Sequence, residues 1–172
     1  SPESVREKIT DRTRVIITVH MAGMPCDLDP FLALSEETGI KILEDCAQAH
    51  GATYKRKKVG TIGDIGCFSM QAGKLLPSGE GGIMITNNLE WYERAVCLGH
   101  YERISKLPDE KYHKYASTCF GYKYRITPLS AAIARVQLRH LDERNKRRDD
   151  NVMYLMDGIA EWPGIYPLKP PD

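Results

Sequence analysis

The chain has 172 residues, of which 42% are hydrophobic and 27% charged, a composition typical of a globular domain rather than a disordered or fibrous protein. Lys and Arg together number 24 against 23 Asp and Glu, so the net charge of +1 offers no field that would attract nucleic acid or an anionic membrane surface. No apolar run approaches the roughly 20 residues that a membrane-spanning helix needs, and the first residues lack the apolar core of a signal peptide. We therefore expect neither nucleic acid nor a membrane as partner.

The cysteines bear on redox environment and metal binding. There are five of them, widely spaced and without a CxxC pair, which disfavours a disulfide framework and makes a reducing cytoplasm the expected location. Metal ligation would draw on His20, Cys46, His50 and Cys67, but their spacing matches no common site. We expect core or hydrogen-bonded roles for these four residues, and no metal.

The first part of the chain predicts a strand–helix–strand unit. The β-branched run at 14–20 is typical of a buried strand, and residues 40–45 predict the next one. Between them, Asp29 and Pro30 are typical of a helix N-cap and first turn, and Gly39 of the helix end. Such a unit favours parallel pairing through a right-handed crossover.

The rest of the chain predicts two more strands and a helical C-terminal part. Short strands are expected at 65–70 and 83–86, and a helix capped by Asn88 is expected to run to about Gly99. Residues 100–120 have weak periodicity and predict a mobile loop. Thr127 and Pro128 predict the start of a long amphipathic helix, and a second helical stretch ends at Trp162. The expected class is α/β, with a parallel or mixed sheet.

Polar residues follow the predicted strands, where open α/β sheets bind their ligands. His20 comes after the first strand, Asp45 and Gln48 after the second, and Ser69 near the end of a third. Lys74 follows in a glycine-rich stretch, which is typical of a phosphate binder or a covalent amine catalyst. The residue order does not fit GxxxxGK[ST], so a nucleotide-binding loop is disfavoured. Taken singly, each residue more often has a purely structural role. A lysine such as Lys74 is usually a solvated surface group, an acid such as Asp45 a helix cap, and a hydroxyl such as that of Ser69 a buried group bonded to the backbone.

Several blocks in order along the chain resemble the DegT/DnrJ/EryC1/StrS family of sugar aminotransferases, which depend on pyridoxal 5'-phosphate (PLP). The blocks are Glu44-Asp-Cys-Ala-Gln-Ala-His-Gly-Ala52, residues 59–69, Lys74 with Gly79-Glu-Gly-Gly82, and Gly121-Tyr-Lys-Tyr-Arg125. The resemblance implies an aspartate-aminotransferase-like (fold type I) α/β large domain, with a mostly parallel sheet flanked by helices and incomplete at both ends. Residues 1–148 would belong to this cofactor-binding domain, and 149–172 to a connecting helix and the start of a truncated C-terminal small domain.

The resemblance also implies a role for five residues. Lys74 stands where the family has the Schiff-base lysine, and Asp45 where it has the carboxylate that pairs with the pyridine nitrogen of the cofactor. Gln48 matches the residue beside the ring hydroxyl, and Ser69 matches a hydroxyl that binds the cofactor phosphate. Lys123 replaces an Asn that reaches the phosphate in the neighbouring subunit, where a lysine would act as a point charge. A homodimer is therefore implied.

The implied reaction is a ping-pong transamination through a Lys74 aldimine. Glutamate or glutamine would give the amine, and a keto-sugar, favoured as nucleotide-linked, or a keto-cyclitol would accept it. One alternative is a sugar dehydratase of the same fold, which Lys74 disfavours because such relatives carry histidine at that position. The other alternative is a non-catalytic homologue or inert fragment acting at most as an interaction module. It is kept open because family members are longer at both ends, and their N-terminal part supplies the group stacked on the cofactor ring.

Overall fold

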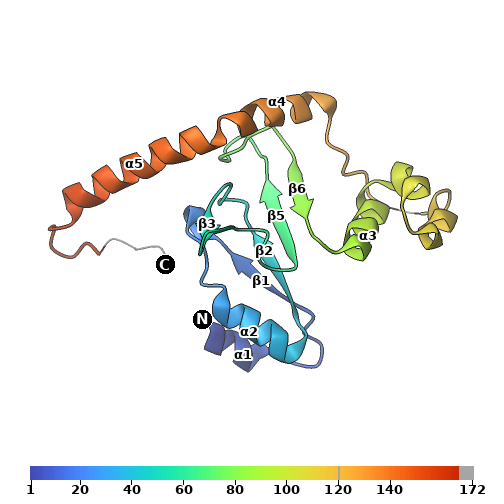
Figure 1. Ribbon diagram of the computed structural model, residues 1–172, viewed down its shortest axis with the longest axis horizontal. Helices are drawn as coiled ribbons and strands as arrows, with labels where there is room; N and C mark the ends of the chain where they lie inside the picture. Colours follow the sequence, from blue (N-terminus) through green and yellow to red (C-terminus); the bar gives the residue numbers. More distant parts are fainter. Residues whose placement is uncertain (120, 167–172) are drawn as a thin grey trace.

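A four-stranded sheet in the order β1-β2-β5-β6 organises the computed structural model, which describes residues 1–119 and 121–166 (Figure 1). β1 pairs parallel with β2, as the strand–helix–strand pattern predicts, and β2 also pairs parallel with β5. β6 is antiparallel to β5, so the sheet is mixed, with one antiparallel edge. Its strands are β1 (Val15–Val19), β2 (Lys41–Asp45), β5 (Ile65–Ser69) and β6 (Gly82–Ile85).

Two helices, α1 (Pro2–Lys8) and α2 (Asp29–Thr38), cover one face of the sheet. Strand alternation turns Ile16 and Ile42 toward α2, where they form a core with helix residues that include Phe31 and Leu34. The opposite face of β1 carries Val15, Ile17 and Val19, which are 43–59% exposed.

Helix α2 begins one residue earlier than the sequence predicts. Leu28 holds the N-cap position without a side-chain hydrogen bond, so Asp29 lies inside the first turn. The predicted Asp29 cap is therefore wrong, and the carboxylate of Asp29 pairs with Lys55 instead. Gly39 ends the helix in the left-handed conformation, at φ 73°, as predicted.

A short 3-10 turn and a small hairpin follow β1 and β2. The turn, η1 (Met21–Gly23), includes Ala22 at a positive φ of 56°. The hairpin pairs β3 (Thr53–Tyr54) with β4 (Lys57–Lys58) and was not predicted. It closes a second core around Leu28, Cys46 and Val59.

Helix α3 (Leu89–Gly99) is capped as predicted, since Asn88 accepts a hydrogen bond from the N–H of Trp91 at 3.1 Å. The segment predicted as a loop differs. It contains two 3-10 helices, η2 (Tyr101–Lys106) and η3 (Glu110–Tyr115), and Ile104 is fully buried. A 3-10 helix repeats every three residues, so the hydrophobic periods of strands and α-helices do not reveal it in the sequence. Residue 120 lies outside the described residues.

Helices α4 (Pro128–Arg139) and α5 (Leu141–Ile159) form a long arm that extends beyond the sheet (Figure 1). Thr127 caps α4 as predicted, accepting from the N–H of Ser130 at 3.2 Å. The helical conformation is interrupted at His140, and α5 ends three residues before the predicted Trp162. The predicted boundary at residue 148 falls inside α5 and stays a prediction, as does the assignment of residues 167–172, which lie outside the described residues.

No helix within 1–119 and 121–166 has the length and apolarity to cross a bilayer.

Candidate functional site

A hollow of about 400 Å³ lies at the carboxyl ends of β2 and β5, on the face that α1 and α2 leave open. Alternation along β2 buries Ile42 and Glu44 on one face of the sheet and turns Leu43 and Asp45 to the other. Asp45 is in register with Cys67 of β5, which brings the end of that strand alongside. The hollow is lined by Ile17, Leu43, Asp45, Ala47, Cys67, Phe68, Ser69 and Gly81.

Two of the predicted site residues, Asp45 and Ser69, therefore meet in one hollow. Asp45 accepts a hydrogen bond from the N–H of Ala47 at 3.0 Å through one carboxylate oxygen, and its other oxygen has no hydrogen-bond partner in the described part of the chain. Ser69 accepts from the N–H of Gln71 at 3.4 Å, which leaves its hydroxyl hydrogen available to a ligand. The hollow thus presents one carboxylate and one hydroxyl between apolar walls.

Gln48 and Lys74 are close in sequence to these two residues but do not line the hollow. Gln48 accepts from the N–H of Ala22 at 2.8 Å and so connects the end of β2 to η1. Lys74 belongs to the loop that joins β5 to β6, where its N–H donates to the carbonyl of Gln71 at 2.9 Å. That loop is closed at its base by a 2.8 Å hydrogen bond from the N–H of Met70 to the carbonyl of Gly81.

Lys123 lies in a separate cluster of charges. Its ammonium group is 3.0 Å from Glu102, which Arg125 also contacts at 2.6 Å. The hydrogen bond with Glu102 raises the pKa of Lys123, so the side chain stays charged at neutral pH. Within the described chain Lys123 is thus paired with Glu102, and it does not line the hollow.

A second hollow, of about 470 Å³, lies at the opposite ends of β2 and β5 and holds none of the predicted site residues. Lys41, Asp64 and Trp91 are among the residues that line it. Asp64 already accepts from the N–H of Ile42 at 2.8 Å and lies 3.7 Å from the Lys41 ammonium group. Because these groups are paired with each other, we place the candidate site at the first hollow.

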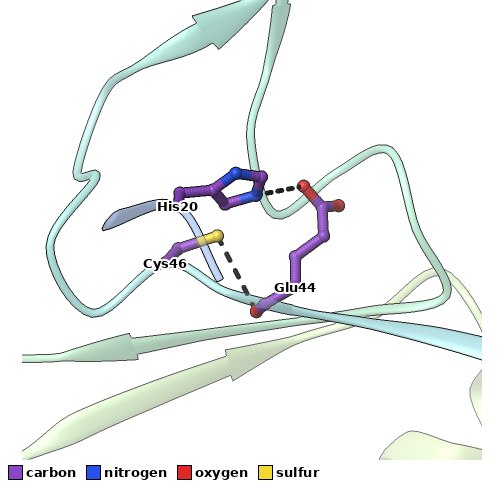
Figure 2. Close-up of side chains that lie close together, drawn as sticks. All are labelled: His20, Glu44 and Cys46. Carbon is purple, nitrogen blue, oxygen red and sulfur yellow. Dashed lines mark hydrogen bonds and ion pairs between the residues drawn. The ribbon is translucent and has the colours of Figure 1, made fainter. Parts of the chain in front are cut away.

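Three of the buried side chains behind the site, His20, Glu44 and Cys46, lie close enough together to suggest a metal site (Figure 2). Glu44 is fully buried, and one of its oxygens accepts from His20 at 3.0 Å and from the N–H of Gly60 at 2.7 Å. Its other oxygen accepts from the N–H groups of Ile62 and Gly63 at 2.8 and 2.6 Å. Burial alone would raise the pKa of Glu44, but these hydrogen bonds outweigh it and lower the pKa.

The donor atoms of this cluster are already engaged, which argues against metal binding. His20 accepts from the N–H of Cys26 through Nδ1 at 3.0 Å and uses Nε2 for Glu44, so neither ring nitrogen is free. Burial, together with the charges of Glu44 and Asp45, raises the pKa of Cys46 to about 12, so its sulfur carries a proton at neutral pH. Core or hydrogen-bonded roles were expected for both residues, and in this geometry His20 is hydrogen-bonded while Cys46 lies in the core.

Glu44 is the site-supporting residue that sequence reasoning missed. Its neighbour Asp45 drew attention because it ends a predicted strand, whereas Glu44 points to the buried face. Residues along β2 alternate between a buried and a more exposed face, and Glu44 falls on the buried face. That position is the signal that would have identified it, because a buried carboxylate requires hydrogen-bond partners. Those partners come from β1 and from loop 60–63, which sequence spacing does not bring together.

The DegT/DnrJ/EryC1/StrS aminotransferase family matches residues 1–172. The chain is 37% identical over 164 residues to the L-glutamine:2-deoxy-scyllo-inosose aminotransferase of Streptoalloteichus tenebrarius, an alignment that covers 93% of this chain and 39% of that protein.

The chain is also similar to solved structures of aminotransferases and of a dehydratase. S. venezuelae DesV, in complex with a ketimine intermediate, has a TM-score of 0.85 at 35% identity, covering 100% of this chain and 45% of that one. E. coli GDP-4-keto-6-deoxy-D-mannose-3-dehydratase, with bound hydrated PLP, has a TM-score of 0.83 at 29% identity, covering 95% and 45%. The predicted α/β class and aspartate-aminotransferase-like fold are confirmed, and the chain spans about two fifths of the length of the relatives it matches.

Proposed function

The chain belongs to the DegT/DnrJ/EryC1/StrS aminotransferase family, and on that premise we propose that it is part of a PLP-dependent enzyme that transfers an amino group to a keto-sugar or keto-cyclitol. The observation that carries the proposal is the meeting of Asp45 and Ser69 in one hollow at the strand ends. Lys74 follows Ser69 by five residues in the loop that leaves this edge of the sheet.

The residues that line the hollow fit this cofactor. Its volume of about 400 Å³ lies within the usual range of small-molecule pockets. Ile17 and Leu43 offer apolar surface to a flat ring, Asp45 offers a carboxylate for a ring nitrogen, and Ser69 offers a hydroxyl donor for a phosphate. Apolar walls with a few convergent polar groups are the usual make-up of a cofactor pocket.

When bound, PLP would supply the electron sink that stabilises negative charge on the carbon next to the transferred nitrogen. Asp45 would hold a proton on the pyridine nitrogen, because a nearby carboxylate favours the charged form of that group. The Lys74 amine would bind the cofactor aldehyde covalently and, once displaced by the amino donor, would take a proton from the substrate carbon and return it. Ser69 would bind the phosphate, and Gln48 would lie beside the ring hydroxyl.

The finer assignments belong to the same proposal. Glutamine or glutamate is the proposed donor, in keeping with the relative named as an L-glutamine-dependent cyclitol aminotransferase. We also propose a homodimer in which Lys123 exchanges Glu102 for the cofactor phosphate of the partner subunit. All five cysteines are free thiols in the structure, which suits the proposed cytoplasmic location.

The test is to add PLP to the purified protein, record the visible spectrum, reduce with borohydride and map the labelled peptide by mass spectrometry. We expect a visible absorption band and label on Lys74. Both should be absent in Lys74→Ala and retained in Lys8→Ala, which removes an exposed lysine of α1. With glutamine and a keto-cyclitol, the wild-type protein should yield an aminated product.

Other outcomes would replace the proposal. A deoxygenated product without a new amine would identify the sugar dehydratase instead. Label scattered over surface lysines, with no visible band, would favour a non-catalytic homologue acting as an interaction module.

A further inference from the structure

Turn η1 is connected to the end of β2 by one side-chain hydrogen bond and one close backbone contact. The N–H of Ala22 donates to the side-chain oxygen of Gln48 at 2.8 Å. A Cβ at Gly23 would lie 3.4 Å from the carbonyl oxygen of Gln48, so the turn packs directly on that residue. Because Ala47, the residue before Gln48, lines the hollow, this connection lies beside the candidate site.

The backbone at the centre of this turn has an unusual conformation. Ala22 has φ 56° and ψ 21°, in the left-handed region that residues with a Cβ rarely adopt, and Gly23 follows at φ 88°. Such a conformation persists only where the surrounding contacts hold it. Here it directs the N–H of Ala22 to Gln48, and the residue that precedes the turn, His20, donates its own N–H to the carbonyl of Asp45 at 3.1 Å.

The contact with the turn decides which end of the Gln48 amide is free. A backbone N–H can only donate, so the atom that faces Ala22 is the oxygen of the amide. The NH₂ group is the other end, and it makes no hydrogen bond within the described part of the chain. Since Gln48 is an exposed residue, this donor group is open to a ligand.

We propose that Ala22 of turn η1 is a positioning residue, whose N–H holds the oxygen of the Gln48 amide so that Gln48 meets the cofactor as a hydrogen-bond donor only. The inference rests on the proposed function, which puts Gln48 beside the ring hydroxyl, and it adds the polarity of that contact and the residue that sets it. A donor favours an oxygen that carries negative charge, so the ring hydroxyl is bound without its proton. Ala22 acts through Gln48 and does not itself contact the cofactor.

Two substitutions separate the two ends of the amide. Gln48→Glu keeps an oxygen for the N–H of Ala22 but has no hydrogen to donate at neutral pH, whereas Gln48→Met keeps the length of the side chain and loses both functions. The control is Gln137→Glu in α4, where the side-chain oxygen accepts from Arg144. In cofactor-free protein, the amide hydrogen of Ala22 should exchange about five to ten times faster in Gln48→Met than in the wild type, and no faster in Gln48→Glu or the control.

Cofactor binding reports on the donor end of the amide. The affinity is read from the fraction of Lys74 fixed by borohydride at graded PLP concentrations. We expect Gln48→Met to weaken PLP binding about tenfold, and Gln48→Glu to weaken it further because its carboxylate repels the ring oxygen. With 3-deoxypyridoxal 5'-phosphate, which lacks the ring oxygen, the wild type and Gln48→Met should bind with equal affinity.

Several results would overturn the inference. PLP binding by Gln48→Glu as tight as that of the wild type would do so, because the oxygen end of the amide would then suffice. Unchanged exchange at Ala22 in Gln48→Met would do so too, as would a loss of affinity in that variant that is absent with PLP or equally large with the 3-deoxy compound. Failure of the proposed function is distinguishable, because wild-type protein would then lack label on Lys74. The exchange at Ala22 would still decide whether the turn fixes the amide.

Discussion

Glu44 shows how a single buried residue holds three parts of the site together. Its carboxylate joins His20 at the end of β1, its own strand β2, and the loop at residues 60–63. The residue after it is Asp45, so the strand end that carries the proposed cofactor carboxylate is fixed from the opposite face of the sheet. A hydrogen bond of 3.1 Å from the N–H of His20 to the carbonyl of Asp45 adds to this support.

We predict that Glu44→Gln destabilises the protein by about 3–5 kcal/mol, because an amide NH₂ would face backbone N–H donors and leave them unpaired. The measurement is urea unfolding at pH 7, with Glu143→Gln as control, since Glu143 is an exposed residue of α5. An equal midpoint for Glu44→Gln and the wild type would contradict the role assigned to this carboxylate.

The same residue predicts a pH dependence. The pKa of Glu44 is lower in the folded protein than its ordinary value of 4.5, so its contribution to stability is fully present above pH 4.5 and is lost as the pH falls through the folded pKa. The difference in unfolding free energy between wild type and Glu44→Gln should therefore narrow on acidification below pH 4.5. A difference that stays constant down to pH 3 would show that the charge of Glu44 is not what stabilises the cluster.

At the scale of elements, the packing of β5 against the loop before it depends on a glycine. A side chain at Gly66 would place its Cβ 2.3 Å from the carbonyl oxygen of Gly60, the same residue whose N–H binds Glu44. We expect Gly66→Ala to cost about 2–3 kcal/mol and to weaken PLP binding, because the loop must move away from Glu44. In Gly158→Ala, an open position in α5, alanine should instead stabilise by up to about 1 kcal/mol. Thermal unfolding of both variants would check the opposite signs, and equal effects would contradict the packing argument.

Elements with local signals could be predicted from the sequence, and those without could not. The four strands of the main sheet were placed to within about a residue because short apolar runs mark them, of which the run in β1 is β-branched, and Asn88, Thr127 and Gly39 marked helix ends. The hairpin at Thr53–Lys58 escaped because its turn uses Lys55 and Arg56 at φ 46° and 66°, where Asn or Gly would be the usual signal. In the site, Asp45 and Ser69 lie together because each stands near the carboxyl end of its strand, as predicted. The partners of Glu44 come together only through tertiary contacts, which sequence spacing does not reveal.

At the scale of the whole molecule, the arm and the lysine-bearing loop share one core. Leu141, the first residue of α5, is 6% exposed and packs with Met70 and Leu76, which flank Lys74 in the sequence. Asn145, one turn further along α5, donates to the carbonyl of His50. The position of the arm is therefore connected physically to the loop that carries Lys74.

This connection predicts that Leu141→Ala has two effects. It should lower the unfolding free energy by about 2–5 kcal/mol, because a buried leucine is lost and a cavity remains. It should also raise amide hydrogen exchange in residues 70–78, because Met70 and Leu76 lose the side chain that holds them. The matched control is Leu129→Ala in α4, where the leucine is 79% exposed and the change should alter stability by no more than about 0.5 kcal/mol. If Leu141→Ala destabilised the protein while exchange in residues 70–78 stayed at the wild-type rate, the arm would support the fold without holding the loop, and the orientation of Lys74 would have to depend on the sheet alone.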